Sequence, residues 1–363
     1  VAEEQEGGGC DLFTGEWIED FKGPRYTNET CSTIESPQNC IRNGRPDSNF
    51  LYWRWKPDGC DLPKFDANEF MRRMRGKSMA LIGDSIMRNQ VQSLLCMLSQ
   101  EEEAVQVYHD VTYKSRRWSF PSHEFSLSVI WTPFLTKAHT FEDDNGVSTA
   151  IIQLHLDELD PAWTDKFWDM DYIIIAGGKW FLKNAVYYEK GRIVGCHGCH
   201  QGNVTELPLE YVYRKVLNLT FEFIAGPDGN GKPYVIFRTT TPDHFENGEW
   251  NSGGYCNRTQ PFEVTRQVEM ADVDRVMRNV ELQEFKAAEE RASKNGVSMH
   301  LLDTTWLSML RPDGHPGVYR EFHPYEGKDR NAKIQNDCLH WCLPGAIDAW
   351  NDLIMEILSR DSQ

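Results

Sequence analysis

The chain has 363 residues, a formal net charge of −17 at pH 7, and 40% hydrophobic and 12% aromatic residues. This composition is typical of a globular protein that buries a substantial core. The negative charge argues against nucleic acid and anionic membrane surfaces, which select basic patches. No apolar run reaches the ~20 residues that a membrane-spanning helix needs.

Residues 1–64 are rich in turns and cysteines and contain no long periodic segment. We expect disulfides and docking onto the rest of the chain to stabilise this segment, because it has little core of its own. Trp53, Arg54 and Trp55 alternate as in a strand, which places both indole rings on one face. That face could stack on sugar rings, or at least one tryptophan could bury against the main body, which we favour.

From residue 65 to 363, apolar runs alternate with helical patterns, which predicts a second, α/β domain. Its sheet is expected to be mainly parallel and covered on both faces, with ligands outside the carboxyl ends of the strands. We expect strands at 79–82, 127–131, 150–154, 172–176, 234–237 and 299–302, and helices at 67–75, 86–98, 209–225 and 272–292.

Ser85 lies where a strand that is buried on both faces becomes a helix, after Gly83 and Asp84. The free N–H groups and the positive end of the helix dipole at such a position can stabilise an oxyanion. Ser85 is therefore a candidate nucleophile. The alternative is that it only caps the helix, which serine does well.

Gly177 and Gly178 follow the predicted strand 172–176, so they should lie on the same edge of the sheet as Ser85. Glycine permits close approach of a backbone to a ligand, which makes this pair a candidate second contributor to an oxyanion hole. A plain turn at the exit of the strand would explain the two glycines equally well.

The ten cysteines and the Asn-x-Ser/Thr sequons favour an oxidising, glycosylating compartment. We expect all the cysteines in disulfides, without predicting their pairing: Cys10, Cys31, Cys40, Cys60, Cys96, Cys196, Cys199, Cys256, Cys338 and Cys342. The candidate glycosylation sites are Asn28, Asn203, Asn218 and Asn257. The cluster 196–200 could hold zinc, but in a secretory protein a disulfide is favoured and no metal is expected.

Asp337 and His340 lie three residues apart in a loop that enters a terminal amphipathic helix. The carboxylate could orient the imidazole and stabilise its charged form. Together with Ser85 they give a Ser/Asp/His set. His200, His315 and His323 compete as bases, but none has an aspartate three residues before it. Trp341 could line a groove or pack beneath the loop, which we favour slightly, and bridges from the flanking cysteines would make the loop rigid.

Two segments of the chain resemble the plant trichome birefringence-like family of Golgi polysaccharide O-acetyltransferases. They are Gly83-Asp84-Ser85 with Arg88-Asn89, and the block 337–345. N-terminal landmarks agree with the resemblance: Cys10-Asp11-Leu12-Phe13-Thr14-Gly15-Glu16-Trp17, Cys40-Ile41-Arg42-Asn43-Gly44-Arg45-Pro46-Asp47 and Trp53-Arg54-Trp55-Lys56-Pro57. The resemblance implies an SGNH/GDSL-like α/β/α sandwich over 65–363, with the Cys-rich segment 1–64 packed on it. It also favours a role for Arg88 and Asn89, as oxyanion donors, in positioning the acceptor or in structure.

The chemistry of the Ser/Asp/His set predicts that His340 takes the proton of Ser85 and that Ser85 forms an acetyl-enzyme. The resemblance decides for an O-acetyltransferase. The expected acceptor is a cell-wall polysaccharide, with xyloglucan ahead of xylan. No bound cofactor is expected. The acetyl donor is acetyl-CoA or another carrier, delivered directly or through a membrane protein. A carbohydrate esterase with the same triad and a non-catalytic wall-polysaccharide-binding protein remain as alternatives.

The resemblance also implies a Golgi lumenal location. The chain begins at Val1 without an initiator methionine or a signal peptide. We therefore expect it to be the lumenal, monomeric part of a single-pass type II membrane protein whose anchor lies upstream.

Overall fold

The structure, a computed structural model, describes residues 10–140, 150–199, 202–226, 233–262, 268–328 and 333–361. Its main sheet has seven strands in the order β13-β12-β9-β3-β6-β5-β4. The first five in this order run parallel, as expected, and an unpredicted antiparallel hairpin, β4–β5, extends one edge. The strand bounds are β3 Ser78–Gly83, β4 Val105–His109, β5 Arg116–Phe120, β6 Phe125–Trp131, β9 Tyr172–Ile175, β12 Tyr234–Arg238 and β13 Met299–Leu302.

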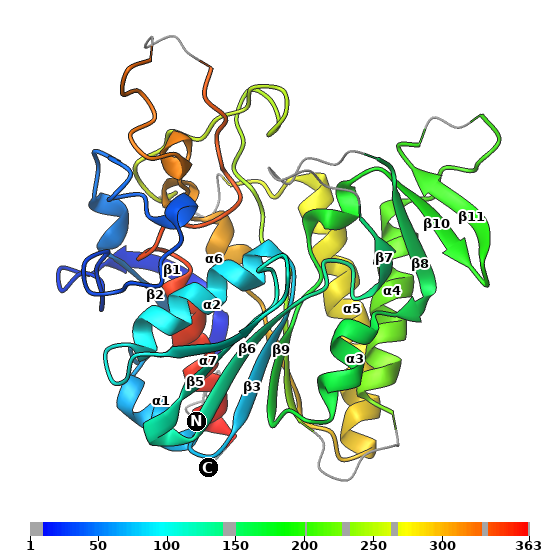
Figure 1. The fold of residues 1–363 in the computed structure, drawn as a ribbon, viewed down its shortest axis with the longest axis horizontal. Helices are drawn as coiled ribbons and strands as arrows, with labels where there is room; N and C mark the ends of the chain where they lie inside the picture. The colour runs from blue at the N-terminus through cyan, green and yellow to red at the C-terminus, as the bar shows by residue number, and fades with distance from the viewer. Residues whose placement is uncertain are drawn as a thin grey trace, which may run out of the picture.

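Helices cover both faces of this sheet, so the molecule is the predicted α/β/α sandwich (Figure 1). Along β3, Met79 and Leu81 belong to one hydrophobic core, and Ala80 and Ile82 belong to the other. This alternation is why β3 reads as an unbroken apolar run. One face carries α1 Ala67–Arg73, α2 Ser85–Leu98 and α7 Asp348–Arg360, and the other carries α3 Pro161–Phe167, α4 Leu209–Ile224 and α5 Asp272–Lys294.

A second sheet of four strands, in the order β11-β10-β8-β7, lies beside α4, on the right in Figure 1. It corrects the prediction that the apolar run 150–154 belongs to the main sheet. Side chains of β8 are buried at Ile152, Leu154 and Leu156, so this strand packs on one face only. The bounds are β7 Thr136–His139, β8 Ile152–Leu159, β10 Ala185–Glu189 and β11 Arg192–His197.

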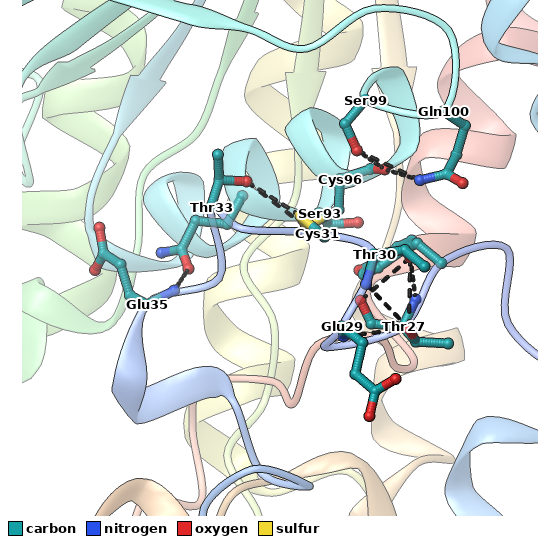
Figure 2. The surroundings of a disulfide bond; sticks show 12 residues. Thr27, Glu29, Thr30, Cys31, Thr33, Glu35, Ser93, Cys96, Ser99 and Gln100 are labelled. Carbon is teal, nitrogen blue, oxygen red and sulfur yellow. Dashed lines mark hydrogen bonds between the residues drawn. A yellow bond between two sulfur atoms is a disulfide. The ribbon is translucent and has the colours of Figure 1, made fainter.

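From residue 10 onward, where the structure describes it, the N-terminal segment packs into the core of the main body. Its two antiparallel strands, β1 Asp11–Glu19 and β2 Trp53–Asp58, contribute Leu12 and Trp55 to the same core as α2 and α7. Trp55 is 2% exposed, so it is packed against the main body as favoured from the sequence. A disulfide between Cys31 and Cys96 fastens the segment to α2 (Figure 2), and the Thr33 hydroxyl lies 3.7 Å from the Cys96 sulfur.

Loops and several short helices gather at the carboxyl edge of the main sheet, where the parallel strands end (Figure 1). The short helices of the described chain are η1 Ser36–Gln38, η2 Asn49–Leu51, η3 Pro121–His123, η4 Lys179–Leu182, α6 Thr305–Met309, η6 Pro312–Gly314 and η7 Val318–Arg320. Among the helices that the structure describes, none is long and apolar enough to cross a membrane.

Candidate active site

Ser85 is the first residue of α2 and follows the turn at which β3 ends. Asp84 is the N-cap, and its Oδ1 accepts a hydrogen bond of 2.9 Å from the Ile86 N–H. The interpretation of Ser85 as only an N-cap is therefore wrong, because Asp84 already fills that role. The half-buried Ser85 side chain lies at the end of the helix where backbone N–H groups lack helical partners.

Glycines let two loops approach each other beside Ser85. Gly83 has a φ of +155°, and a β-carbon there would lie 3.0 Å from the carbonyl oxygen of Ala176. A β-carbon on Gly178 would lie 2.1 Å from Oδ2 of Asp84. The loop after β9 therefore contacts the loop after β3, which confirms that Gly178 and Asp84 share one edge of the sheet.

Asp337 and His340 form the pair expected from their spacing. His340 Nδ1 donates to Asp337 Oδ2 at 2.8 Å. The other carboxylate oxygen accepts the backbone N–H groups of His340 at 3.0 Å and of Leu339 at 3.2 Å. With Nδ1 engaged as a donor, Nε2 of His340 is the ring nitrogen left to accept a proton.

The electrostatics of the pair favour a charged carboxylate and a basic imidazole. Burial acts to raise the pKa of Asp337, but the charge of His340 and the hydrogen bonds hold that pKa well below its usual range. Burial acts to lower the pKa of His340, but the charge and hydrogen bond of Asp337 raise it above its usual value. The His340 side chain stays 22% exposed, so a substrate can reach the imidazole.

Two disulfides anchor the loop that carries His340, residues 336–345, which is called the catalytic loop for the role proposed for it. Cys338 is bonded to Cys256 and Cys342 to Cys40, so each bridge joins the loop to a distant segment. Because both bridges flank His340, they restrict the loop on either side of the imidazole.

Asn89 connects α2 to the catalytic loop. The buried side chain of Asn89 accepts from the Trp341 backbone N–H at 2.7 Å and donates to the Trp341 carbonyl at 3.2 Å. Asn89 lies one helical turn beyond Ser85, and Trp341 directly follows His340. This contact therefore holds the catalytic loop against α2. Of the capacities left open for Asn89, these hydrogen bonds support the structural one.

Ser85 and His340 themselves are not joined by a hydrogen bond within the described chain. Electrostatic interaction of His340 with Asp84, the neighbour of Ser85, acts on the pKa of both groups. Catalytic hydrogen bonds are often long in free enzymes and shorten when substrate binds. The expected contact between Ser85 and His340 therefore stays a prediction.

The side chains of Arg88 and Trp341 both contact other residues of the chain. Arg88 forms an ion pair with Glu35 of the N-terminal segment at 3.3 Å. Trp341 is fully buried, and its ring centroid lies 4.3 Å from that of His315. Trp341 therefore packs beneath the loop, as favoured from the sequence.

A buried polar network behind the two glycines was not predicted. Glu281 of α5 accepts hydrogen bonds from Tyr213 at 2.6 Å and from the backbone and hydroxyl of Thr240 at 2.9 and 2.6 Å. Burial raises the pKa of Glu281 to about 7. The Tyr213 hydroxyl would lie 2.4 Å from a β-carbon on Gly177, so the network supports the glycine loop. These residues come from separate elements, so no spacing in the sequence could reveal them.

The competing histidines lie elsewhere or serve another purpose. The backbone N–H of His323 donates to the carbonyl of Asn43 in the N-terminal segment. His200 lies outside the described residues. His315 is 4% exposed and contacts the carbonyl of His340, a contact treated below.

The remaining predicted sites fall on several parts of the fold. Cys10 is bonded to Cys60, and Cys196 to Cys199, so a local disulfide occupies the cluster considered for zinc. Among the sequons, Asn203 and Asn257 are exposed and Asn28 is half-buried. Asn218 lies within α4, where its amide donates to Glu284 of α5 at 3.3 Å.

Comparisons with known proteins identify the family of the chain. The model of the GDSL/SGNH-like acyl-esterase family found in Pmr5 and Cas1p matches residues 62–357, and that of the PMR5 N-terminal domain matches residues 8–61. Protein trichome birefringence-like 25 of Arabidopsis thaliana is 55% identical over 98% of this chain and 78% of the relative.

Two further relatives have names that state an activity. Xyloglucan O-acetyltransferase 1 of Arabidopsis thaliana is 44% identical over 97% of this chain and 80% of its own length. Xyloglucan O-acetyltransferase 4 of Populus trichocarpa is 41% identical over 97% of this chain and 81% of its own length. The turn after β3, the Asp337–His340 pair and these matches lead to one conclusion: the chain belongs to the GDSL/SGNH-like acyl-esterase family and, within it, to the trichome birefringence-like proteins.

Proposed function

We propose that this polysaccharide O-acetyltransferase transfers acetyl groups to xyloglucan through a covalent acetyl-serine at Ser85. The observation that carries the proposal is the Asp337–His340 hydrogen bond of 2.8 Å, which leaves Nε2 of His340 as a base on the edge of the sheet that carries Ser85. The names of the two xyloglucan O-acetyltransferase relatives support the acceptor, with xylan as the next candidate.

In the first half-reaction, Nε2 of His340 takes the proton of the Ser85 hydroxyl, and the serine oxygen attacks the acetyl carbonyl of the donor. The tetrahedral intermediate collapses when the bond from the carbonyl carbon to the donor's leaving group breaks. His340 then returns its proton to that leaving group, and acetyl-Ser85 remains.

Backbone donors around Ser85 would stabilise the oxyanion of each tetrahedral intermediate. The N–H of Ser85 at the start of α2 and the backbone of Gly178, which contacts Asp84, are the candidates. Asn89 is not a candidate for this role, because its amide is already hydrogen-bonded to the Trp341 backbone.

In the second half-reaction, His340 deprotonates a sugar hydroxyl, whose oxygen attacks acetyl-Ser85 and releases the serine with the proton returned. If water replaced the sugar, the same residues would make an esterase. The donor is acetyl-CoA or another acetyl carrier, supplied directly or through a membrane protein, and the proposed setting is the Golgi lumen.

The test is a mass-spectrometric transfer assay with an acetyl donor and either xyloglucan or xylan oligosaccharides. Wild type should acetylate xyloglucan oligosaccharides, and Ser85→Ala should abolish transfer. Ser122→Ala, which changes an exposed serine in η3, is the matched control and should keep full activity. Free acetate without acetylated sugar, even at high acceptor concentration, would establish the esterase instead.

A further inference from the structure

Two histidines outside the proposed triad form a continuous chain of contacts beneath the catalytic loop. Nε2 of His244 lies 2.9 Å from the carbonyl oxygen of Met309, and Nδ1 of His315 lies 2.7 Å from the carbonyl oxygen of His340. The two remaining ring nitrogens, His244 Nδ1 and His315 Nε2, face each other at 2.7 Å.

Protons can be counted from these contacts. A carbonyl oxygen only accepts hydrogen bonds, so the nitrogen that faces Met309 and the one that faces His340 must each carry a hydrogen. If both rings were neutral, both inner nitrogens would be bare, and two lone pairs would point at each other across 2.7 Å. One additional proton turns that repulsion into an N–H···N hydrogen bond.

We infer that His244 and His315 hold three protons between them, as a positively charged imidazole–imidazolium pair, and that this pair positions the backbone of His340. The proton count stands apart from the proposed function, whereas the effect on catalysis rests on it.

Burial opposes charge on the pair and opposes a second charge most strongly, so the 2.7 Å contact between the inner nitrogens is what retains the one additional proton. Burial lowers the pKa of His244, and burial together with the charge of His244 lowers the pKa of His315 still further, which disfavours a doubly charged pair. The charged groups that act on the pair are the carboxylates Asp243, Asp313 and Asp337 and the cations Lys179 and Arg45.

The cations among these groups are already paired. Lys179 contacts both Asp243 at 3.0 Å and Asp274 at 2.5 Å, so these three side chains together carry a net negative charge. Arg45 is paired with Asp47 at 2.8 Å. Asp313 is likewise paired, with Arg311 at 2.8 Å.

Packing against an aromatic ring adds to the stabilisation of the charge. The ring centroid of His315 lies 4.3 Å from that of Trp341, and an aromatic face attracts a cation.

The pair is tied to the catalytic loop at two points. His315 donates to the carbonyl of His340, and the backbone N–H of His244 donates to the carbonyl of Cys338 at 2.9 Å. These contacts fix the backbone on which the imidazole of His340 is carried. His244 and His315 are therefore positioning residues, which touch neither substrate nor the reacting atoms.

The direct test is NMR of the full chain labelled with ¹⁵N-histidine, at neutral pH. The expected result is a protonated Nε2 on His244, a protonated Nδ1 on His315 and a third, strongly downfield proton that couples to both inner nitrogens. Two protons in total on the two rings would overturn the inference. This measurement needs neither substrate nor a variant.

Two substitutions at one position separate the positioning contact from the shared proton. The amide nitrogen of His315→Asn can replace Nδ1 and keep the bond to His340, but it cannot reach His244. The longer side chain of His315→Gln places its amide nitrogen where Nε2 was, so this variant loses the hydrogen bond to the carbonyl of His340. We expect His315→Gln to lower kcat on the order of 10- to 100-fold with little change in KM, because a misplaced catalytic group costs rate rather than binding.

His315→Asn should keep a kcat close to wild type at neutral pH, because it keeps the contact with His340, while NMR of this variant should show no proton shared with His244. An equal kcat for the two variants, both near wild type, would overturn the positioning role. If wild type transferred no acetyl group at all, the proposed function would fail, while the NMR proton count would still decide the inference.

Discussion

At the scale of the residue, Asp337 uses both of its oxygens on the segment that carries His340. One oxygen binds the imidazole and the other binds two backbone N–H groups of the loop. The carboxylate thus selects the tautomer of His340 and fixes the direction of its ring. The same carboxylate raises the pKa of His340, which makes the imidazole a stronger base.

Asp337→Asn should lower kcat on the order of 10³- to 10⁴-fold, because the amide can stabilise neither the imidazolium nor the right tautomer. The remaining activity should also change its pH dependence. His340 must be neutral to act as a base, so activity falls as the pH drops through its pKa. Removal of the carboxylate lowers that pKa, and the acid limb of the pH–rate profile should move to lower pH.

A shift of that limb to higher pH would contradict the assigned role of Asp337. Asp61→Asn, which removes an exposed carboxylate of the N-terminal segment, is the control for loss of an acidic group and should leave the limb in place.

The close contact at Gly178 gives a second prediction at this scale. Gly178→Ala should abolish most of the acetyl transfer, because the added methyl group would lie 2.1 Å from the Asp84 carboxylate and force the two loops apart. Gly202→Ala is the matched control, since a β-carbon there meets nothing within 4 Å. Equal activity of the two variants would show that the contact between the loops is dispensable.

At the scale of the element, α2 both begins at Ser85, directly after β3, and supports the catalytic loop. Its first turn presents Ser85, and its second turn holds the Trp341 backbone through Asn89. A single rigid helix thereby sets the distance between two segments that are far apart in the chain. A site built on a helix is more precise than one built from loops alone.

Asn89→Ala should reduce both stability and activity. The buried N–H and carbonyl of Trp341 would lose their partners, which should cost about 1–3 kcal/mol in the free energy of unfolding. Denaturant unfolding measures that cost, and kcat should fall while KM changes little. Gln100→Ala, at an exposed residue just beyond α2, should change neither quantity. A stable Asn89→Ala enzyme with full kcat would show that the contact between α2 and the catalytic loop is not needed for catalysis.

At the scale of the whole molecule, disulfides join parts of the chain that the sheet does not connect. Three of the five bridges link segments outside the main sheet to α2 or the catalytic loop: Cys31–Cys96, Cys40–Cys342 and Cys256–Cys338. The N-terminal segment shares its core with α2 and α7, so it is part of the structure that holds His340 in place.

The bridges should differ in their effect on stability according to the loops that they close. Cys40→Ala/Cys342→Ala opens a bridge with a sequence separation of 302 and should cost roughly 2–5 kcal/mol, mainly because the unfolded chain gains freedom. Cys196→Ala/Cys199→Ala opens one with a separation of 3 and should cost much less. Thermal unfolding of both variants measures the difference, and equal losses would contradict this account.

Sequence alone determined the features that depend on local pattern. The apolar run before Ser85, the helical spacing after it and the three-residue step from Asp337 to His340 each carry their own signal, because they concern neighbouring residues. The long helices and the parallel strands of the main sheet were predicted for the same reason. The run at 150–154 was assigned to the wrong sheet, since an apolar pattern gives the burial of a strand and not its partner.

Only the tertiary structure decided which distant residues meet. The pairing of the cysteines, the hold of Asn89 on Trp341, the network around Glu281 and the contact between His244 and His315 all join residues from separate elements. Such contacts are fixed by how whole layers pack, and a single sequence holds no local trace of them. The sequence therefore determined which residues could do the chemistry, and the packing of the layers decided which partners hold them in place.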